Sequence, residues 1–307
     1  MARSTRPSKG HSKQLLKIDD LSKAQVKTLI ESAYLKLKKG RITPSKSKAL
    51  PVGLIFAESS TRTRVSFERA ARSLGMEPYL LESFSSSLSK GEDLSDTVLN
   101  LQALGINAFV VRTTSTEELL ALRALGVSVL NAGDGVGEHP SQALLDLLCL
   151  YAKFGASWPK LLKQKLCIVG NLSHSRVVNS WIALGKLLGL SIELVSPKAW
   201  RPSLLEDFRW SEDLEQGLEE ATVVMALRVQ RERLGTGSTA DLHDYVSSYQ
   251  ITPKLLAGRP LMHPGPINWG VELAPELREY ANSLILDQVR CGYYLRATLL
   301  EHFILGR

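Results

Sequence analysis

The sequence predicts an α/β protein with two domains, each a parallel sheet flanked by helices in a Rossmann-like manner and linked by interdomain helices. Three observations lead to this fold class. The chain has 307 residues, of which 44% are hydrophobic, so it can bury two cores. Short apolar runs rich in β-branched residues alternate with stretches of helical periodicity. This alternation is typical of parallel sheets, whose strands need crossover helices.

The predicted elements follow one another along the chain. A polar helix at 23–39 comes first. The first half then contains strands at 52–57, 78–81, 108–111 and 127–130, and helices at 62–74 and 94–104. The second half follows a Leu-rich helix at 142–152 and contains strands at 166–169, 191–195, 222–226 and 260–262. A last helix at 289–305 has apolar residues at helical spacing and should pack back on the body of the protein.

Domain boundaries are predicted from these elements and from composition. Residues 1–13 are basic and Ser-rich and are expected to form a disordered tail. The first domain is predicted at 14–141 and the second at 142–288, with the loop 154–159 as the seam between the halves. The C-terminal helix, 289–307, is expected to return to the first domain.

Composition excludes several classes of protein. The apolar stretch 183–195 is interrupted by glycines and charges and falls short of the ~20 residues of a membrane span, so no membrane partner is expected. The N-terminus lacks the apolar core of a secretory signal, which favours the cytoplasm. Cys149, Cys167 and Cys291 lie far apart among apolar neighbours, as reduced buried thiols do. The net charge of +7 is concentrated in the tail and accompanies no nucleic-acid-binding motif, so no nucleic acid is expected.

A cluster of hydroxyl groups marks a candidate phosphate site. The strand at 52–57 leads into Ser60-Thr61-Arg62-Thr63, after which apolar residues recur at helical spacing. Free backbone N–H groups at the start of a helix, joined by hydroxyls and a guanidinium, suit a phosphate. The alternative is an ordinary helix cap with an exposed basic first turn. That alternative leaves arginine at the positive end of the helix dipole with no anion to offset it.

The glycine-rich segment 131–142 is a second candidate site. It follows the strand at 127–130, and it places His139 and Gln142 one helical turn apart. A histidine at a helix start is also common as a cap or as a core residue. A dinucleotide site is not favoured, because the glycine pattern lacks the second half of that motif.

Arginines follow several predicted strands. Arg112 and Arg228 end strands, and Arg176 follows the loop after the strand at 166–169. Open α/β sheets bind ligands at the carboxyl ends of their strands, so together these guanidiniums indicate a ligand with more than one anionic group. Each alone is better explained as a solvated surface arginine. The Ser-rich loop 83–91 carries Lys90 and suggests a mobile lid, or a plain flexible loop.

Taken together, four segments resemble the catalytic chains of the aspartate/ornithine carbamoyltransferase superfamily, over about 15–305. These are 60–68, 139–146, 228–234 and 263–266. The first motif is shared by the whole superfamily, whereas Arg-Val-Gln at 228–230 and His-Pro-Gly-Pro at 263–266 are specific to its aspartate branch. An ornithine-specific relative would carry cysteine at Ser141 and a His-Cys-Leu-Pro loop late in the chain.

The resemblance implies transfer of the carbamoyl group of carbamoyl phosphate to the amine of L-aspartate, the second step of de novo pyrimidine synthesis. It makes 14–141 the carbamoyl phosphate-binding domain and 142–288 the aspartate-binding domain. The residues implied to contact carbamoyl phosphate are Ser60, Thr61, Arg62, Thr63, Arg112, His139, Gln142, Pro264 and Gly265. The catalytic residues among them are Arg62, Thr63, Arg112, His139 and Gln142. Those implied to bind aspartate are Lys90, Arg176, Arg228 and Gln230.

The resemblance also implies individual roles. Thr63, Arg112 and His139 would donate to the carbamoyl oxygen, where negative charge develops. Gln142 and the backbone carbonyl of Pro264 would hold the carbamoyl nitrogen. Arg176 would bind the α-carboxylate of aspartate, and Arg228 with Gln230 the β-carboxylate. Ser86 and Lys90 would enter the site of a neighbouring subunit, which implies a homotrimer with shared active sites.

No metal or organic cofactor is expected, because carbamoyl phosphate arrives activated and phosphate can leave with the amine proton.

Three residues beside the aspartate half depart from the family pattern: Asn171 replaces the usual Asp, Ser173 a common Lys, and Trp269 a frequent Arg. Two alternatives therefore stay open, a carbamoyltransferase for another amine and a non-catalytic member that acts as a scaffold. Assembly with a regulatory chain or a dihydroorotase-like partner is also left open.

Overall fold

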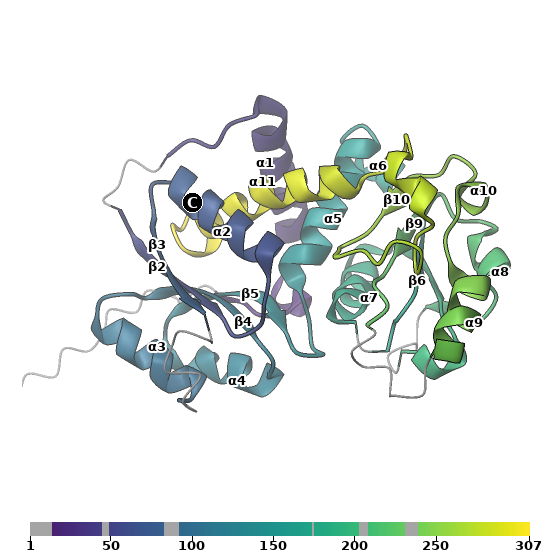
Figure 1. Cartoon of the computed structure of the whole chain (residues 1–307). Coiled ribbons are helices and arrows are strands. Elements are labelled where there is room, and N and C mark those ends of the chain that lie inside the picture. The colour runs from purple at the N-terminus through teal and green to yellow at the C-terminus, as the bar shows by residue number, and fades with distance from the viewer. Residues whose placement is uncertain (1–13, 45–48, 83–91, 174, 203–207, 231–238) are drawn as a thin grey trace, which may run out of the picture.

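The computed structural model describes residues 14–44, 49–82, 92–173, 175–202, 208–230 and 239–307, and it forms two lobes side by side (Figure 1). Each lobe is built on a five-stranded sheet whose strand pairs are all parallel. Helices flank both sheets. The predicted fold class is confirmed.

The first sheet has the strand order β1-β5-β4-β2-β3. Its strands are β1 (Gln14–Leu15), β2 (Pro51–Phe56), β3 (Glu77–Glu82), β4 (Ala108–Thr113) and β5 (Ser128–Asp134). Neighbouring residues of β2 point to opposite faces, so Leu54 packs with Phe67 of α2 (Thr61–Ser73), and Ile55 packs with Leu94 of α3 (Leu94–Ala103). Because helices cover both faces, the strand is a continuous apolar run.

The second sheet has the strand order β10-β9-β6-β7-β8. Its strands are β6 (Lys165–Val169), β7 (Ser191–Val195), β8 (Arg209–Ser211), β9 (Val223–Ala226) and β10 (Leu261–Met262). The helices around it are α6 (Trp158–Leu161), α7 (Arg176–Leu188), α8 (Leu214–Leu218), α9 (Thr239–Tyr249) and α10 (Pro253–Leu256). Along β6, Ile168 faces the core shared with α7, and Val169 faces a separate core with α8 and α10.

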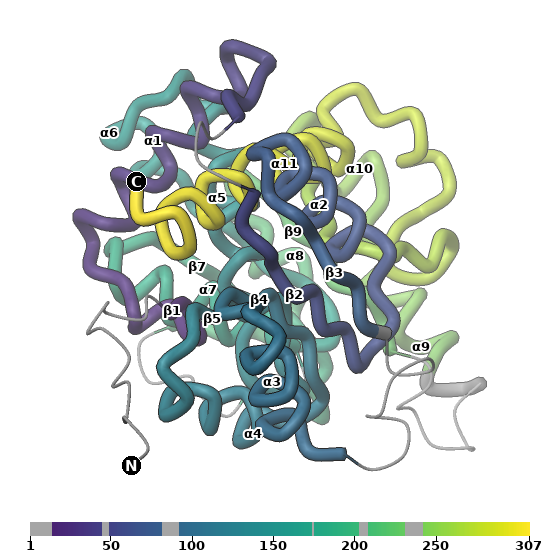
Figure 2. Tube along the Cα trace, turned by 90° about the vertical axis from the view of Figure 1, so that its left-hand side faces the viewer, coloured from purple at the N-terminus to yellow at the C-terminus, as the bar shows by residue number. Residues whose placement is uncertain are grey.

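Three helices fill the junction of the lobes. They are α1 (Lys23–Lys39), α5 (Pro140–Lys153) and α11 (Ile285–Phe303), which contact one another (Figure 2). Helix α5 is buried from Pro140 to Tyr151 on every side, as its apolar composition predicts. Helix α11 also packs on α2, and Lys36 of α1 forms a 2.7 Å ion pair with Glu301 of α11.

The chain crosses from one lobe to the other at two neighbouring points. The first crossing follows α5, and the second precedes α11. Lys153, at the end of α5, donates from Nζ to Oδ1 of Asn282, three residues before α11 begins, over 2.6 Å. The two connections are therefore fastened to each other.

Some predicted boundaries were wrong for identifiable reasons. Helix α5 starts at Pro140 and not at 142, because proline is favoured in the first helical turn. Helix α11 starts at Ile285 and not at 289. The prediction missed its first turn because Leu286 and Val289 are exposed, so the apolar residues there do not mark one buried face. Strands β1 and β8 were not predicted, because two or three residues are too few to show alternation. The helix α4 (Thr116–Ala121) was also missed, because its six residues are too few to show helical periodicity.

The described part of the chain contains no helix that combines the length and apolar character needed to cross a bilayer. Cys149, Cys167 and Cys291 are all buried and free of disulfides. Their environment matches the expectation of reduced structural thiols.

Candidate active site

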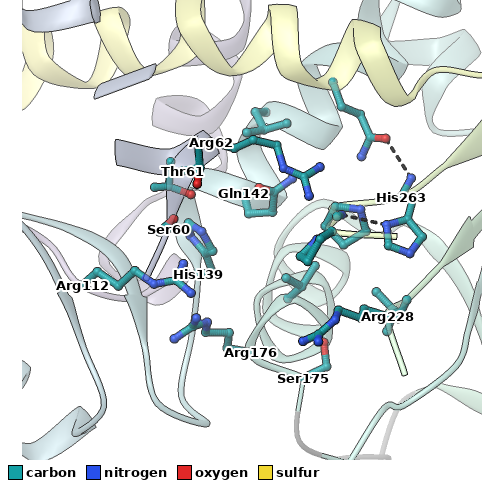
Figure 3. A pocket seen from close by; sticks show the side chains of 18 of the residues that line it. Ser60, Thr61, Arg62, Arg112, His139, Gln142, Ser175, Arg176, Arg228 and His263 are labelled. Atoms are coloured by element: carbon teal, nitrogen blue, oxygen red, sulfur yellow. Dashed lines mark hydrogen bonds between the residues drawn. The ribbon is translucent and has the colours of Figure 1, made fainter. Parts of the chain in front are cut away.

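A cavity of about 680 Å³ is lined by residues of both lobes (Figure 3). Its walls are loops that follow the carboxyl ends of strands β2, β4 and β5 in the first lobe and β6, β9 and β10 in the second. The strand ends of the two sheets thus meet at one place, where open α/β sheets bind their ligands. Among the described lining residues are five arginines and a single carboxylate, Glu58, so the cavity suits an anion.

The start of α2 forms one wall of this cavity. Ser60 is the N-cap residue, but its side chain makes no capping hydrogen bond, and the first turn holds no acidic residue. Thr63 is buried, and burial lowers the pKa of the Arg62 guanidinium. Uncommitted hydroxyls, free N–H groups and the positive end of the helix dipole here all face the cavity, which makes a seat for a phosphate-sized anion.

Glu58 joins two of the arginines. Its Oε2 lies 3.2 Å from Nε of Arg112 and 2.8 Å from Nη2 of Arg176. Arg112 belongs to β4 of the first lobe, whereas Arg176 begins α7 of the second. Burial lowers the pKa of Arg112 to about 10, the charge of Arg176 lowers it too, and Glu58 opposes both effects. The Arg112 guanidinium therefore stays charged at neutral pH, and the Glu58 carboxylate holds Arg112 and Arg176 close together across the lobes.

His139 and Gln142 lie at the start of α5, and both line the cavity. The backbone N–H of His139 donates to Oγ of Ser180 over 2.9 Å, which fixes the loop against α7. Burial lowers the pKa of His139 well below its ordinary value, and the charges of Arg176, Arg112 and Arg296 lower it further. The imidazole is therefore neutral at pH 7, with one ring N–H to donate.

We expect His139 to remain neutral well below the ordinary imidazole pKa near 6.5, because burial and the nearby guanidiniums oppose its protonation. Between that depressed pKa and the ordinary value near 6.5, the unfolded chain binds the proton more tightly than the folded chain. The contribution of His139 to stability is thus present above pH 6.5 and declines as the pH falls. NMR titration of the imidazole nitrogens checks this, and protonation with a midpoint above pH 6 would contradict it.

The second lobe contributes residues after β9 and β10. Arg228 and Gln230 line the cavity, and the segment between them is tied to the loop after β10. Glu272 is fully buried, and its carboxylate accepts from the backbone N–H of Asn268 (2.5 Å) and from that of Val229 (3.5 Å). The segment after β9 and the loop after β10 therefore share one buried anchor.

The loop after β10 is closed by its own histidine. The Nδ1 atom of His263 accepts from the backbone N–H of Gly265 over 2.7 Å, and the backbone N–H of His263 donates to Gln288 (Figure 3). Gly265 has φ +65°, and a Cβ atom built there would overlap the guanidinium of Arg62. A side chain at this position would therefore displace Arg62 from its place across the cavity.

Gly265→Ala is expected to weaken the binding of inorganic phosphate by about tenfold, because it moves one charged donor of the anion seat. Gly270→Ala is the matched control. Gly270 also has a positive φ (+86°), but a Cβ atom there meets nothing within 4 Å. Calorimetric titration with phosphate measures the effect. Equal losses in both variants would show that backbone strain, and not Arg62, is responsible.

The structure brings the predicted residues together. All of those in the described chain line this one cavity: Ser60, Thr61, Arg62, Thr63, Arg112, His139, Gln142, Arg176, Arg228, Gln230, Pro264 and Gly265. Ser86 and Lys90 lie outside the described residues. Sequence reasoning gave no individual role to several other lining residues, although Ser66 and His263 lie within the motifs 60–68 and 263–266; these residues are Glu58, Ser66, Ser175, His263, Gln288 and Arg296. For Gln288 and Arg296 a sequence signal was available, because both are polar residues within the otherwise apolar last helix.

The three departures from the family pattern occupy different surroundings. Asn171 lines the cavity and is buried, and its Oδ1 has no hydrogen-bond partner among the described residues. Ser173 is not part of the cavity lining. Trp269 is also outside the lining; it packs on the second-lobe core, with the Arg278 guanidinium 4.8 Å from its ring centre. Only Asn171 can therefore touch a ligand in this cavity directly.

Comparison with known proteins gives consistent matches along the chain. A family model described as the carbamoyl-P binding domain of aspartate/ornithine carbamoyltransferase matches residues 13–152, and one described as the Asp/Orn binding domain matches residues 162–303. The aspartate carbamoyltransferase catalytic subunit of Legionella pneumophila (strain Corby) is 40% identical, over 95% of this chain and 99% of that protein. The catalytic subunit from Thermus thermophilus is 39% identical, over 96% and 99%.

Solved structures agree with the sequence matches. Aspartate transcarbamoylase from Trypanosoma cruzi in complex with carbamoyl phosphate superposes with a TM-score of 0.81 at 25% identity, covering 94% of this chain and 95% of that one. The catalytic subunit of the M. jannaschii enzyme superposes with a TM-score of 0.81 at 27% identity, covering 96% and 99%.

Proposed function

The chain belongs to the aspartate/ornithine carbamoyltransferase family, and from that premise we propose that its interlobe cavity transfers the carbamoyl group of carbamoyl phosphate to the amine of L-aspartate. The products are N-carbamoyl-L-aspartate and phosphate. The observation that carries the proposal is the convergence of the predicted residues from both lobes on one cationic cavity. A dianionic donor and a dicarboxylic acceptor together need several guanidiniums, and the cavity supplies them.

Carbamoyl phosphate is assigned to the first lobe. Its phosphate lies at the start of α2, held by Ser60 to Thr63 and by Arg112. Its carbonyl oxygen faces Thr63, Arg112 and neutral His139, which donate to it as the amine attacks and negative charge builds up. These donors are fixed before the reaction by burial and by the ion pair with Glu58, so little reorganisation is needed.

Aspartate is assigned to the second lobe, residues 142–288. Arg176 takes the α-carboxylate, and Arg228 with Gln230 takes the β-carboxylate, which leaves the amine directed toward the carbamoyl carbon. The C–N bond forms, the C–O bond to phosphate breaks, and the departing phosphate accepts the proton of the amine. The backbone carbonyl of Pro264 and the Gln142 side chain hold the carbamoyl nitrogen during this step.

The reaction is tested by incubating the protein with carbamoyl phosphate and L-aspartate and measuring phosphate and carbamoyl-aspartate. Ornithine and putrescine in place of aspartate are the comparison, because neither has two carboxylates for Arg176 and Arg228. Turnover with aspartate, but not with ornithine or putrescine, supports the proposal. Turnover with another amine would move the assignment to a different acceptor, and no turnover with any amine would favour a scaffold.

We further propose a homotrimer in which Ser86 and Lys90 complete the site of the neighbouring subunit, with Lys90 contacting aspartate. The edge strand β3 supports a subunit contact here, because Tyr79 and Leu80 expose 44% and 40% of their surface. Light scattering gives the oligomeric state. Mixing inactive Lys90→Ala and His139→Ala chains should restore partial activity, because some sites then receive both intact residues; a mixture without activity would contradict shared sites.

A further inference from the structure

Asp146 is a buried carboxyl group one helical turn beyond Gln142 on α5, and it does not line the cavity. Its Oδ1 accepts from Nε2 of Gln142 (2.9 Å) and from Nε2 of Gln288 (2.7 Å). Its Oδ2 lies 3.4 Å from Nε1 of Trp181, which also donates to it. Three helices, α5, α7 and α11, therefore direct side-chain donors at this carboxyl group.

This arrangement determines how the Gln142 side chain is oriented. A carboxylate oxygen can only accept hydrogen bonds, so the amide NH₂ of Gln142 must face Asp146. Gln142 also lines the cavity, which leaves its carbonyl oxygen as the atom available to a ligand. Without Asp146, the carboxamide could turn over, because its two ends are nearly the same size.

Gln288 keeps Oδ1 of Asp146 a hydrogen-bond acceptor. Gln288 accepts from the backbone N–H of His263 with its Oε1 (2.9 Å), so its own NH₂ is committed to Asp146. Burial raises the pKa of Asp146 to about 7, while the hydrogen bonds from Gln288, Gln142 and Trp181 lower it. With Gln288 fixed, Oδ1 remains an acceptor when the acid is protonated, since the proton then resides on Oδ2.

We propose that Asp146 is a positioning residue for substrate selection: it fixes the Gln142 carboxamide with its oxygen toward the cavity, where it accepts an N–H of the carbamoyl group. The inference rests on the proposed function. A carbamoyl NH₂ and an acetyl CH₃ are nearly equal in size, so the cavity shape separates them poorly. An oriented acceptor separates them well, because only the carbamoyl group offers it a donor and a methyl group leaves it unpaired.

The test compares two ligands on the full-length protein. Dissociation constants for carbamoyl phosphate and for acetyl phosphate are measured for the wild type and for Asp146→Leu, which keeps the branched shape and removes the acceptor. We expect carbamoyl phosphate to bind about tenfold more weakly to D146L, while the value for acetyl phosphate changes by less than about twofold. The preference for carbamoyl over acetyl phosphate therefore falls about tenfold.

Two further variants distinguish positioning from simple packing. Asp146→Asn retains an oxygen at Oδ1 for both glutamines, because Gln288 cannot turn without losing His263, so its preference for carbamoyl phosphate should stay near that of the wild type. Trp181→Phe removes only the contact to Oδ2 and is the matched control. It should lower thermal stability and leave the preference unchanged.

Equal weakening of both ligands by D146L would overturn the proposal, since a purely structural role predicts that result. An unchanged preference would overturn it too. If D146L does not fold, Asp146→Ala carries the same comparison with a smaller side chain. A wild-type protein that binds phosphate but not carbamoyl phosphate would instead contradict the proposed function, so the two failures are distinguishable.

Discussion

Replacing His139 by alanine is expected to lower kcat by a hundredfold or more, with phosphate affinity nearly unchanged. The imidazole is buried beside Arg112 and Arg176, and its depressed pKa makes it a neutral donor. A neutral donor adds little to the binding of a ground-state anion, but it stabilises the charge that develops on the carbonyl oxygen in the transition state. Loss of one such donor typically costs about 3 kcal/mol. Steady-state kinetics and phosphate titration measure the two quantities separately.

The exposed histidine of α9, His243, supplies the control, since His243→Ala removes an imidazole outside the cavity lining and should leave kcat unchanged. If H139A retains turnover within tenfold of the wild type, His139 is not a donor to the reacting oxygen. If phosphate affinity falls together with kcat, the residue supports the anion seat instead.

Replacing Arg228 by alanine is expected to raise the KM for aspartate by about a hundredfold and to leave the dissociation constant of carbamoyl phosphate unchanged. Arg228 follows β9 in the second lobe, on the opposite side of the cavity from the anion seat at α2 (Figure 3). Truncating one partner of a desolvated charge pair costs on the order of 2–5 kcal/mol. Initial rates at varied aspartate and calorimetry with carbamoyl phosphate give the two values.

Arg228→Lys keeps the charge but loses the planar two-donor fork, so its KM should fall between those of the wild type and R228A. A parallel loss of carbamoyl phosphate binding in R228A would show that the arginine serves the whole cavity. An unchanged KM would remove it from the acceptor site.

The anion seat could be predicted from sequence because its parts are local. Ser60, Thr61, Arg62 and Thr63 follow one another, and both the strand before them and the helix after them carry strong periodic signals. Arg112 and Arg228 could also be predicted as site residues, because the carboxyl ends of parallel strands lie at one edge of a sheet. That these edges of the two sheets face each other across one cavity is seen only in the folded structure.

The supporting residues could not be predicted in the same way, since their partners are distant along the chain. Glu58 meets Arg176 over 118 positions, and Asp146 meets Gln288 over 142. A carboxyl group within the Leu-rich run of α5 gives no local sign of which donors will surround it. Glu272 is likewise an ordinary acidic residue in the sequence, and only the fold gives it the backbone N–H groups of two loops.

The fastening of Lys153 to Asn282 has a mechanical consequence. The lobes are also linked by the ion pair of Glu58 with Arg176 and by the hydrogen bond from the backbone N–H of His139 to Ser180. Together with the two fastened connections, these links limit how far one lobe can shift against the other. The donors on the two walls of the cavity therefore keep their spacing before a ligand arrives, and binding need not spend free energy on bringing them together.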